Sequence, residues 1–80
     1  MDFWAEWCMP CKMLAPVIEE LSSEANGTYK VAKVNVDEAP SLAAQYEVMS
    51  IPTVLVFRNG QITNKSIGVV PKASLLELLK

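Results

Sequence analysis

The two cysteines of this sequence, Cys8 and Cys11, are the residues whose type and spacing suggest chemistry. A short apolar run precedes them, and residues 12–21 carry apolar side chains at helical spacing. We therefore expect both thiols where a strand turns into a helix N-terminus, at which unpaired N–H groups and the helix dipole favour negative charge. A thiolate carries that charge and is the form that attacks sulfur. Two cysteines at this spacing can also close on each other, which indicates dithiol–disulfide exchange.

Three other interpretations of the cysteines are open from local chemistry alone. A structural disulfide over so short a ring would stabilise the fold by roughly 2 kcal/mol, before strain is subtracted. A zinc site needs about four ligands, and the sequence has no histidine and no third cysteine, so two chains would have to share the metal. Two buried, inert thiols are the third. A Cys-x-x-Cys motif beside a strand–helix pattern favours the redox interpretation.

The composition is that of one small globular domain. The 80 residues are 51% hydrophobic and 20% charged, with a net charge of −2. This charge argues against a nucleic-acid or anionic-membrane surface, which would need a clustered positive patch. No apolar run reaches the roughly 20 residues of a membrane span, and the N-terminus lacks the pattern of a signal peptide. A cytoplasmic location is therefore expected, a removed secretory leader being the alternative.

The elements that must position the cysteines follow an α/β pattern, β-α-β-α-β-β-α. We expect strands over residues 1–6, 29–36, 54–57 and 62–67, and helices over residues 8–25, 40–46 and 71–80. The early strands should pair in parallel through crossovers, with residues 29–36 as a central strand, and Asn59-Gly60 predicts a tight antiparallel hairpin. The last helix should bury a stripe of Leu75, Leu76, Leu78 and Leu79.

Three residues outside the cysteine loop have two interpretations each. Asp2 is either solvated at the terminus, which its position favours, or buried as a proton acceptor. Lys33 either extends to water, the preferred interpretation, or pairs with Asp2 on the neighbouring strand. Pro52 is either an ordinary trans proline, as base rates favour, or a cis proline that exposes the backbone of Ile51.

The stretch Asp2-Phe3-Trp4-Ala5-Glu6-Trp7-Cys8-x-Pro10-Cys11-Lys12 resembles the active-site signature of the thioredoxin family. The likeness continues through Ala15-Pro16, Val31-Ala32-Lys33-Val34-Asn35-Val36-Asp37, Ser50-Ile51-Pro52-Thr53 and Phe57-Arg58-Asn59-Gly60, as far as Gly68. It covers nearly the whole chain in the right order. The resemblance implies a thioredoxin-like fold, with a mixed four-stranded sheet flanked by three helices.

The resemblance also implies roles for the residues around the cysteines. Cys8 would be the exposed nucleophile and Cys11 the resolving thiol, the two forming the redox disulfide. Asp2 would be a buried acid that takes a proton from Cys11, with Lys33 modulating it. Both assignments reverse the interpretation that the residues alone favour.

The substrate-binding groove implied by the resemblance surrounds the sulfurs. Pro52 would be cis and would face the cysteine pair, and the Ile51 backbone would bind the substrate chain. Met9 stands where the family usually has glycine and would add an oxidisable apolar side chain at the rim. The expected groove residues are Trp7, Met9, Pro10, Ile51, Pro52, Ile67 and Gly68, with Trp4 packing beneath the site.

The expected activity is the reduction of protein disulfides, with a thioredoxin reductase restoring the dithiol. No bound cofactor or metal is expected, because the cysteine pair carries both electrons, and neither nucleic acid nor membrane is an expected partner. One rival is a thioredoxin-like scaffold that holds a partner in its groove. The other is a dimeric metal or iron–sulfur carrier to which each chain lends two thiolates.

The start of the chain departs from the family pattern. Thioredoxins normally have a further strand and helix before the signature, which Met1 directly precedes here. We therefore expect residues 1–80 to form a single domain shortened at its N-terminus. An uncovered sheet edge and apolar surface would then favour self-association.

Overall fold

The computed structural model describes all residues from Met1 to Lys80. The elements are β1 (Asp2–Trp4), α1 (Met9–Ser23), β2 (Lys33–Asn35), α2 (Pro40–Gln45), β3 (Thr53–Arg58), β4 (Gln61–Ile67) and α3 (Lys72–Leu78). The four strands form one mixed sheet in the order β2-β1-β3-β4. The predicted α/β fold with a four-stranded sheet and three helices is confirmed.

The strand pairing follows the predicted directions. β1 pairs in parallel with β2 and antiparallel with β3, and β3 pairs antiparallel with β4. Asn59 and Gly60 connect β3 to β4 with φ angles of 54° and 79°, the left-handed values that a tight two-residue hairpin turn requires. The Asn-Gly prediction is confirmed.

The second strand differs from its prediction in length and position. Residues 29–36 were expected to form a central strand, but only Lys33–Asn35 is a strand, and β2 lies at the edge of the sheet. Its only partner is β1, which is itself three residues long. A strand is defined by its ladder, so the flanking apolar residues stay outside the sheet despite their β-branched pattern.

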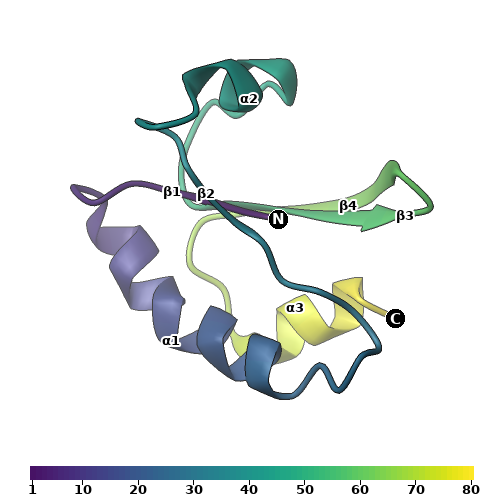
Figure 1. Cartoon of the computed structure of the whole chain (residues 1–80). Helices are drawn as coiled ribbons and strands as arrows, with labels where there is room; N and C mark the ends of the chain where they lie inside the picture. The colour runs from purple at the N-terminus through teal and green to yellow at the C-terminus, as the bar shows by residue number, and fades with distance from the viewer.

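The helices cover both faces of the sheet. Figure 1 shows α2 on one face and α1 with α3 on the other. Successive strand residues point to opposite faces, so Val54 packs against the α1 and α3 side while Leu55 belongs to the α2 side. The core on the α1 and α3 side consists of Leu14, Ile18, Leu21 and Leu75.

The predicted apolar stripe of α3 is only partly buried. Leu75 is 3% exposed, whereas its neighbour Leu76 is 37% exposed and was wrongly placed in the stripe. Leu78 and Leu79 are half-buried against the core. No helix is both long and apolar enough to span a membrane.

Candidate active site

Cys8 caps the N-terminus of α1, and Cys11 lies in the first turn of that helix. A disulfide joins them, with their Cα atoms 5.2 Å apart. The backbone N–H of Cys11 donates a hydrogen bond to Cys8 Sγ at 3.2 Å, in the place where a side-chain oxygen caps an ordinary helix. After reduction, the same N–H and the positive helix end would stabilise a Cys8 thiolate.

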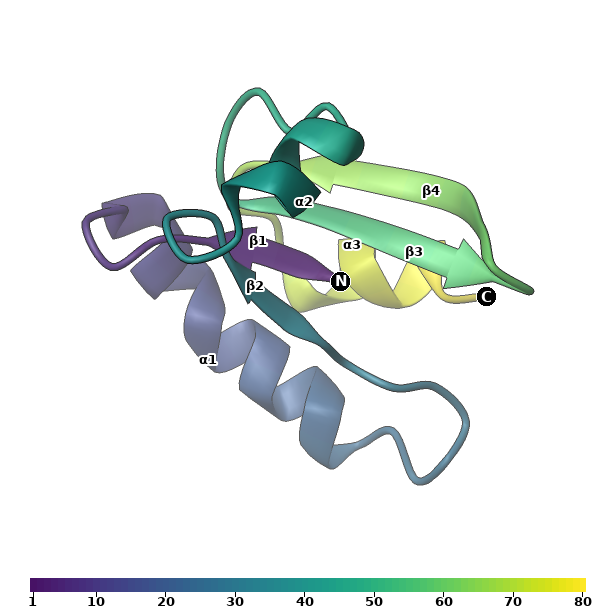
Figure 2. The same cartoon turned by 45° about the horizontal axis from the view of Figure 1, so that its top comes forward.

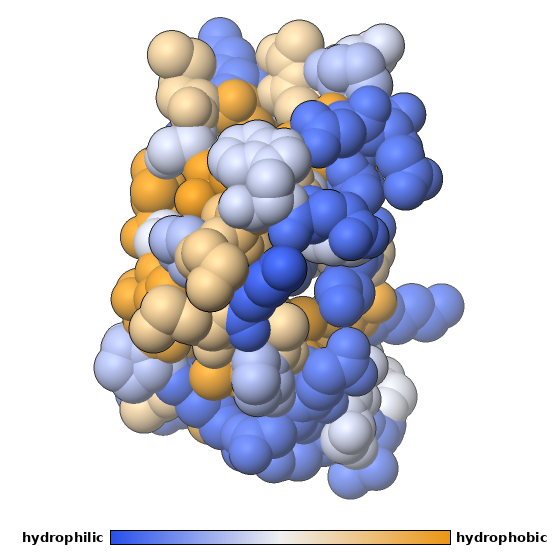
Figure 3. All heavy atoms as spheres, turned by 90° about the vertical axis from the view of Figure 1, so that its left-hand side faces the viewer, coloured by the Kyte–Doolittle hydropathy of each residue, from blue (hydrophilic) through white to orange (hydrophobic).

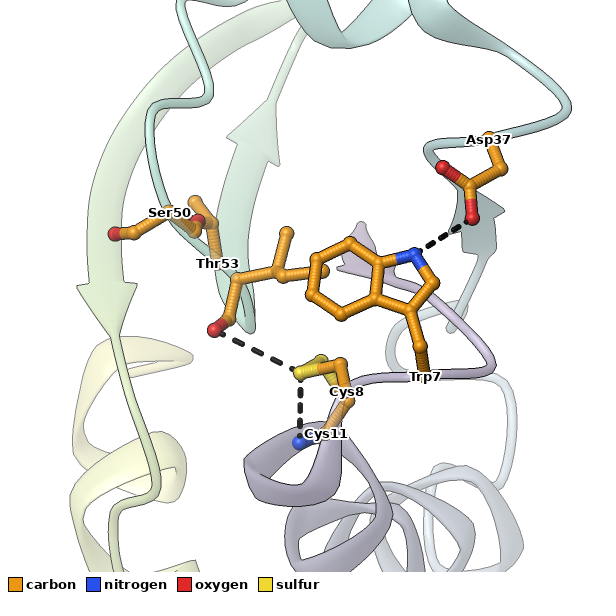
Figure 4. Close-up of a disulfide and its surroundings, with 7 residues drawn as sticks. Trp7, Cys8, Cys11, Asp37, Ser50 and Thr53 are labelled. Carbon is orange, nitrogen blue, oxygen red and sulfur yellow. Dashed lines mark hydrogen bonds between the residues drawn. A yellow bond between two sulfur atoms is a disulfide. The ribbon is translucent and has the colours of Figure 1, made fainter.

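Both cysteines are nearly enclosed in the disulfide form. Cys8 is 3% exposed and Cys11 is 6% exposed, so the expectation of an exposed Cys8 is not met in this state. The reason is the loop that carries Ile51, whose carbonyl oxygen lies 3.8 Å from Cys8 Sγ (Figure 4). A disulfide sulfur carries no hydrogen, so this approach is a contact and not a hydrogen bond.

The loop opposite the disulfide is shaped by Pro52. The Ile51–Pro52 peptide bond is cis, so the trans interpretation was wrong, and the Pro52 ring is fully buried. The N–H of Gly68 donates to the Pro52 carbonyl at 2.9 Å, which brings the end of β4 beside this loop. The buried Thr53 hydroxyl donates to the Ser50 carbonyl and closes the turn (Figure 4).

Trp7 is held by a residue that the sequence prediction missed. Its indole Nε1–H donates to Asp37 Oδ2 at 2.8 Å, as Figure 4 shows, and the ring is 67% exposed. From the sequence, Asp37 was placed only within the stretch of residues 31–37 that resembles the thioredoxin family, without a role at the site. Parallel strands end at the same edge of a sheet, so Asp37 after β2 could have been expected near Trp7 after β1.

Exposed apolar side chains gather around the disulfide. Trp7, Met9 and Ile67 are 67%, 66% and 55% exposed, respectively. Figure 3 views the end of the molecule that carries the β1–α1 loop, and hydrophobic side chains gather on one side of that face while hydrophilic ones cover the other. Of the remaining predicted groove residues, Pro10 is exposed, Ile51 and Gly68 are half-buried, and Pro52 is buried.

Asp2 is buried behind the disulfide and not solvated, so the interpretation favoured by its terminal position was wrong. It is 6% exposed, and its Oδ1 atom has no hydrogen-bond partner. Burial raises the pKa of Asp2 above its ordinary value, while the charges of Lys33 and the N-terminal ammonium oppose that rise. The carboxyl therefore has an increased tendency to hold a proton.

A small cavity connects Asp2 with Cys11. Its volume is about 110 Å³, and its lining consists of Asp2, Trp4, Cys11, Lys12, Ala15 and Lys33. A water molecule needs roughly 10–15 Å³ and several polar partners, so the cavity has room for water between the carboxyl and the sulfur. Trp4 Nε1 is also buried without a partner and is a candidate donor to such water.

Lys33 extends to solvent, as the residues alone suggested, and makes no direct ion pair with Asp2. Its Nζ atom lies 3.5 Å from Glu19 Oε1 and 5.6 Å from the centroid of the Trp4 ring. Lys33 acts on Asp2 through its charge, which lowers the pKa of that carboxyl. The structure contains no group of three or more histidine, cysteine, aspartate or glutamate side chains that could hold a metal ion.

Comparisons with a family model and with known sequences agree on the family of this chain. The family model described as Thioredoxin matches residues 1–80. The sequence is similar to the thioredoxins of Staphylococcus aureus strains Mu50, MW2 and N315, each 56% identical over 79 residues. Those residues are 99% of this chain and 76% of each relative.

Proposed function

We propose a mechanism from the premise that this chain belongs to the thioredoxin family and is a thiol–disulfide oxidoreductase. The observation that carries the mechanism is the Cys8–Cys11 disulfide at the N-terminus of α1, with the Cys11 N–H directed at Cys8 Sγ. The two cysteines have different surroundings, and the proposed roles follow from that difference. Residues 1–80 act as one thioredoxin-like unit.

In the reduced protein, Cys8 is the nucleophile. Its thiolate attacks one sulfur of a substrate disulfide, so that a Cys8–substrate bond forms as the substrate S–S bond breaks and one substrate thiolate leaves. Support comes from the N-cap position of Cys8, because a negative sulfur there receives the Cys11 N–H and the positive end of the helix. Ile51, 3.8 Å from Cys8 Sγ, lies where the backbone of an extended substrate could bind.

Cys11 is the resolving thiol. Its thiolate attacks Cys8 Sγ, the mixed disulfide breaks, and the second substrate sulfur leaves with its electron pair. The products are a reduced substrate and the Cys8–Cys11 disulfide seen in this structure. A thioredoxin reductase returns two electrons to the pair, and the cytoplasm is the proposed setting because a reductant must itself be kept reduced.

Asp2 accepts the proton that Cys11 loses. Both residues line the cavity of about 110 Å³, and water within it would carry the proton between them. The raised pKa of the buried Asp2 carboxyl supports this role, because a carboxylate with a higher pKa is a stronger base. Lys33 tunes that pKa through its charge.

The substrate polypeptide docks on the apolar surface around the disulfide. The proposed docking residues are Trp7, Met9, Pro10, Ile51, Pro52, Ile67 and Gly68. Trp7 and Ile67 support this by their large exposed apolar side chains, whereas buried Pro52 contributes by shaping the loop. The Asp37 carboxylate orients the Trp7 ring.

The first test is reduction of insulin by the purified protein with dithiothreitol, beside Cys8→Ser and Cys11→Ser variants. Loss of catalysis in both variants is expected. When each variant is mixed with oxidised insulin in the absence of dithiothreitol, Cys11→Ser should accumulate a mixed disulfide because no second thiol resolves it, whereas Cys8→Ser should form none. A folded wild-type protein with no rate above that of dithiothreitol alone would contradict the mechanism. That outcome would favour the alternative function of a scaffold that binds partners without turnover.

We also propose that the chain self-associates through the β2 edge. β2 has a partner strand on one side only, and beside it a cavity of about 800 Å³ opens between the sheet, α1 and α3, with 13 of its 18 lining residues hydrophobic. The opposite edge is less suitable, because no residue of β4 lines this cavity and the ladder between β4 and β3 is interrupted by a bulge.

A further inference from the structure

Two exposed methionines extend the apolar surface beyond the disulfide. Met9 is the first residue of α1 and Met13 follows four residues later, and each is 66% exposed. Residues at this spacing are neighbours on one face of a helix, with Cβ atoms about 5–6 Å apart. We call Met9 and Met13 the methionine ridge.

The methionine ridge is continuous with the surface around the reacting bond. Met9 directly follows Cys8, and helical side chains lean toward the helix N-terminus, so Met13 is directed back toward the disulfide end. Farther along α1 the exposed side chains are polar apart from Pro16, and they include Glu19, Glu20, Ser22 and Ser23. The large exposed apolar side chains of α1 are thus confined to the end that carries the chemistry.

We propose that the methionine ridge binds apolar side chains beside the substrate disulfide, and that oxidation of its thioethers by a hydroperoxide switches this binding off. The proposal rests on the proposed function, since it concerns docking at the same site. The occupant is the substrate polypeptide, because the ridge continues the surface around the disulfide. Flexible methionine side chains suit substrates of varied shape.

The chemical step is oxygen transfer to sulfur. A thioether sulfur attacks the O–O bond of hydrogen peroxide, an S–O bond forms as that bond breaks, and the products are methionine sulfoxide and water. Sulfur is oxidised by two electrons and the peroxide is reduced by two. The sulfoxide is polar, so a docked apolar side chain loses its favourable surface. In the disulfide form the cysteines hold no thiolate, whereas both methionines are exposed.

The experiment treats the disulfide form with hydrogen peroxide, removes the oxidant and confirms oxidation of Met9 and Met13 by peptide mass spectrometry. KM and kcat are then measured with insulin and with a small aromatic disulfide. We expect the KM for insulin to rise about fivefold, with kcat and the small-disulfide rate unchanged. An unchanged KM for insulin with both sulfoxides present would overturn the proposal.

Leucine variants identify the responsible sulfurs, because leucine keeps an apolar side chain that peroxide does not oxidise. In a Met9→Leu and Met13→Leu double variant, peroxide should leave the KM for insulin where it was before treatment. Met49→Leu is the matched control, since Met49 is 94% exposed but lies outside the ridge, and this variant should remain sensitive. If Met49→Leu alone lost the effect of peroxide on the KM for insulin, the effect would belong to Met49 and the proposal would be overturned. Failure of untreated protein to reduce either substrate would instead refute the proposed function.

Discussion

At the scale of single residues, two chemically identical side chains acquire different roles from their positions on one helical turn. Cys8 caps α1 and receives the Cys11 N–H at 3.2 Å, which stabilises charge on its sulfur. Cys11 lines the cavity that it shares with Asp2. In the proposed mechanism, the first sulfur holds a negative charge after reduction and the second loses its proton to Asp2.

Asp2→Asn should stabilise the protein at neutral pH while slowing its reaction. Burial raises the pKa of Asp2 in the folded state, so between its unfolded value near 4 and the raised value the folded protein holds a proton that the unfolded chain has released. The free energy of unfolding contributed by this group is then full below about pH 4 and falls as the pH rises through that window. Asparagine does not ionise, so Asp2→Asn should not show this decrease in the free energy of unfolding as the pH rises.

Urea titrations of wild type and Asp2→Asn at several pH values measure this effect. The variant should be the more stable protein at pH 7, and insulin reduction by it should be slower by about tenfold or more. Equal pH dependence in the two proteins would show that Asp2 ionises as freely when folded as when unfolded.

At the scale of elements, α1 links the chemistry to the core. Its N-terminus presents the cysteines, and its apolar stripe packs against Leu75 of α3. Figure 2 shows the two helices in a view tilted by 45° from that of Figure 1. Lys72 of α3 also forms ion pairs with Glu20 and Glu24 of α1, although these exposed pairs contribute little to stability. The position of α1 therefore depends more on this apolar core, to which Val54 of the sheet also contributes, than on the ion pairs.

Leu75→Ala tests this packing, with Leu76→Ala as its matched control. The two residues are adjacent on α3, but Leu75 is 3% exposed and belongs to the core while Leu76 is 37% exposed. We expect Leu75→Ala to lower the free energy of unfolding by about 2–5 kcal/mol. Leu76→Ala should cost clearly less. Urea denaturation followed by circular dichroism gives both values, and equal losses would contradict the packing described here.

At the scale of the whole molecule, the two edges of the sheet are unlike. β2 adjoins the apolar cavity between the sheet, α1 and α3, whereas β4 is a longer strand with exposed polar residues. Edge strands present unpaired backbone groups, and at β2, although it begins with the exposed Lys33, these groups adjoin an apolar surface. Self-association is therefore expected at the β2 side.

Ala32→Lys should weaken self-association, since this exposed residue lines the cavity next to β2. A charge there must be desolvated when the edge is covered, so we expect the dissociation constant to rise about tenfold or more. Sedimentation equilibrium over a range of concentrations measures it. Ile62→Lys, at an exposed position on β4, is the control and should leave the constant unchanged. A wild-type protein that stays monomeric at all concentrations would refute the association itself.

The features that depend on neighbours along the chain could be predicted from the residues alone. Helical periodicity predicted α1, the Asn59-Gly60 pair predicted the hairpin, and Cys8 and Cys11 were correctly placed at a strand-to-helix turn. The motifs that resemble thioredoxin correctly predicted that Asp2 is buried and that the peptide bond before Pro52 is cis. For both residues, reasoning from the local sequence alone favoured the wrong alternative. These features are encoded within a few residues, because capping, turn formation and periodicity are local interactions.

Contacts between residues distant in the chain became known from the three-dimensional fold. The Trp7–Asp37 hydrogen bond and the enclosure of Cys8 by the Ile51 loop each join segments far apart in the chain. Residues 29–36 have the pattern of a central strand, yet β2 is a short edge strand. Burial and strand pairing depend on which surfaces pack together, and a residue's own neighbours in sequence do not specify that.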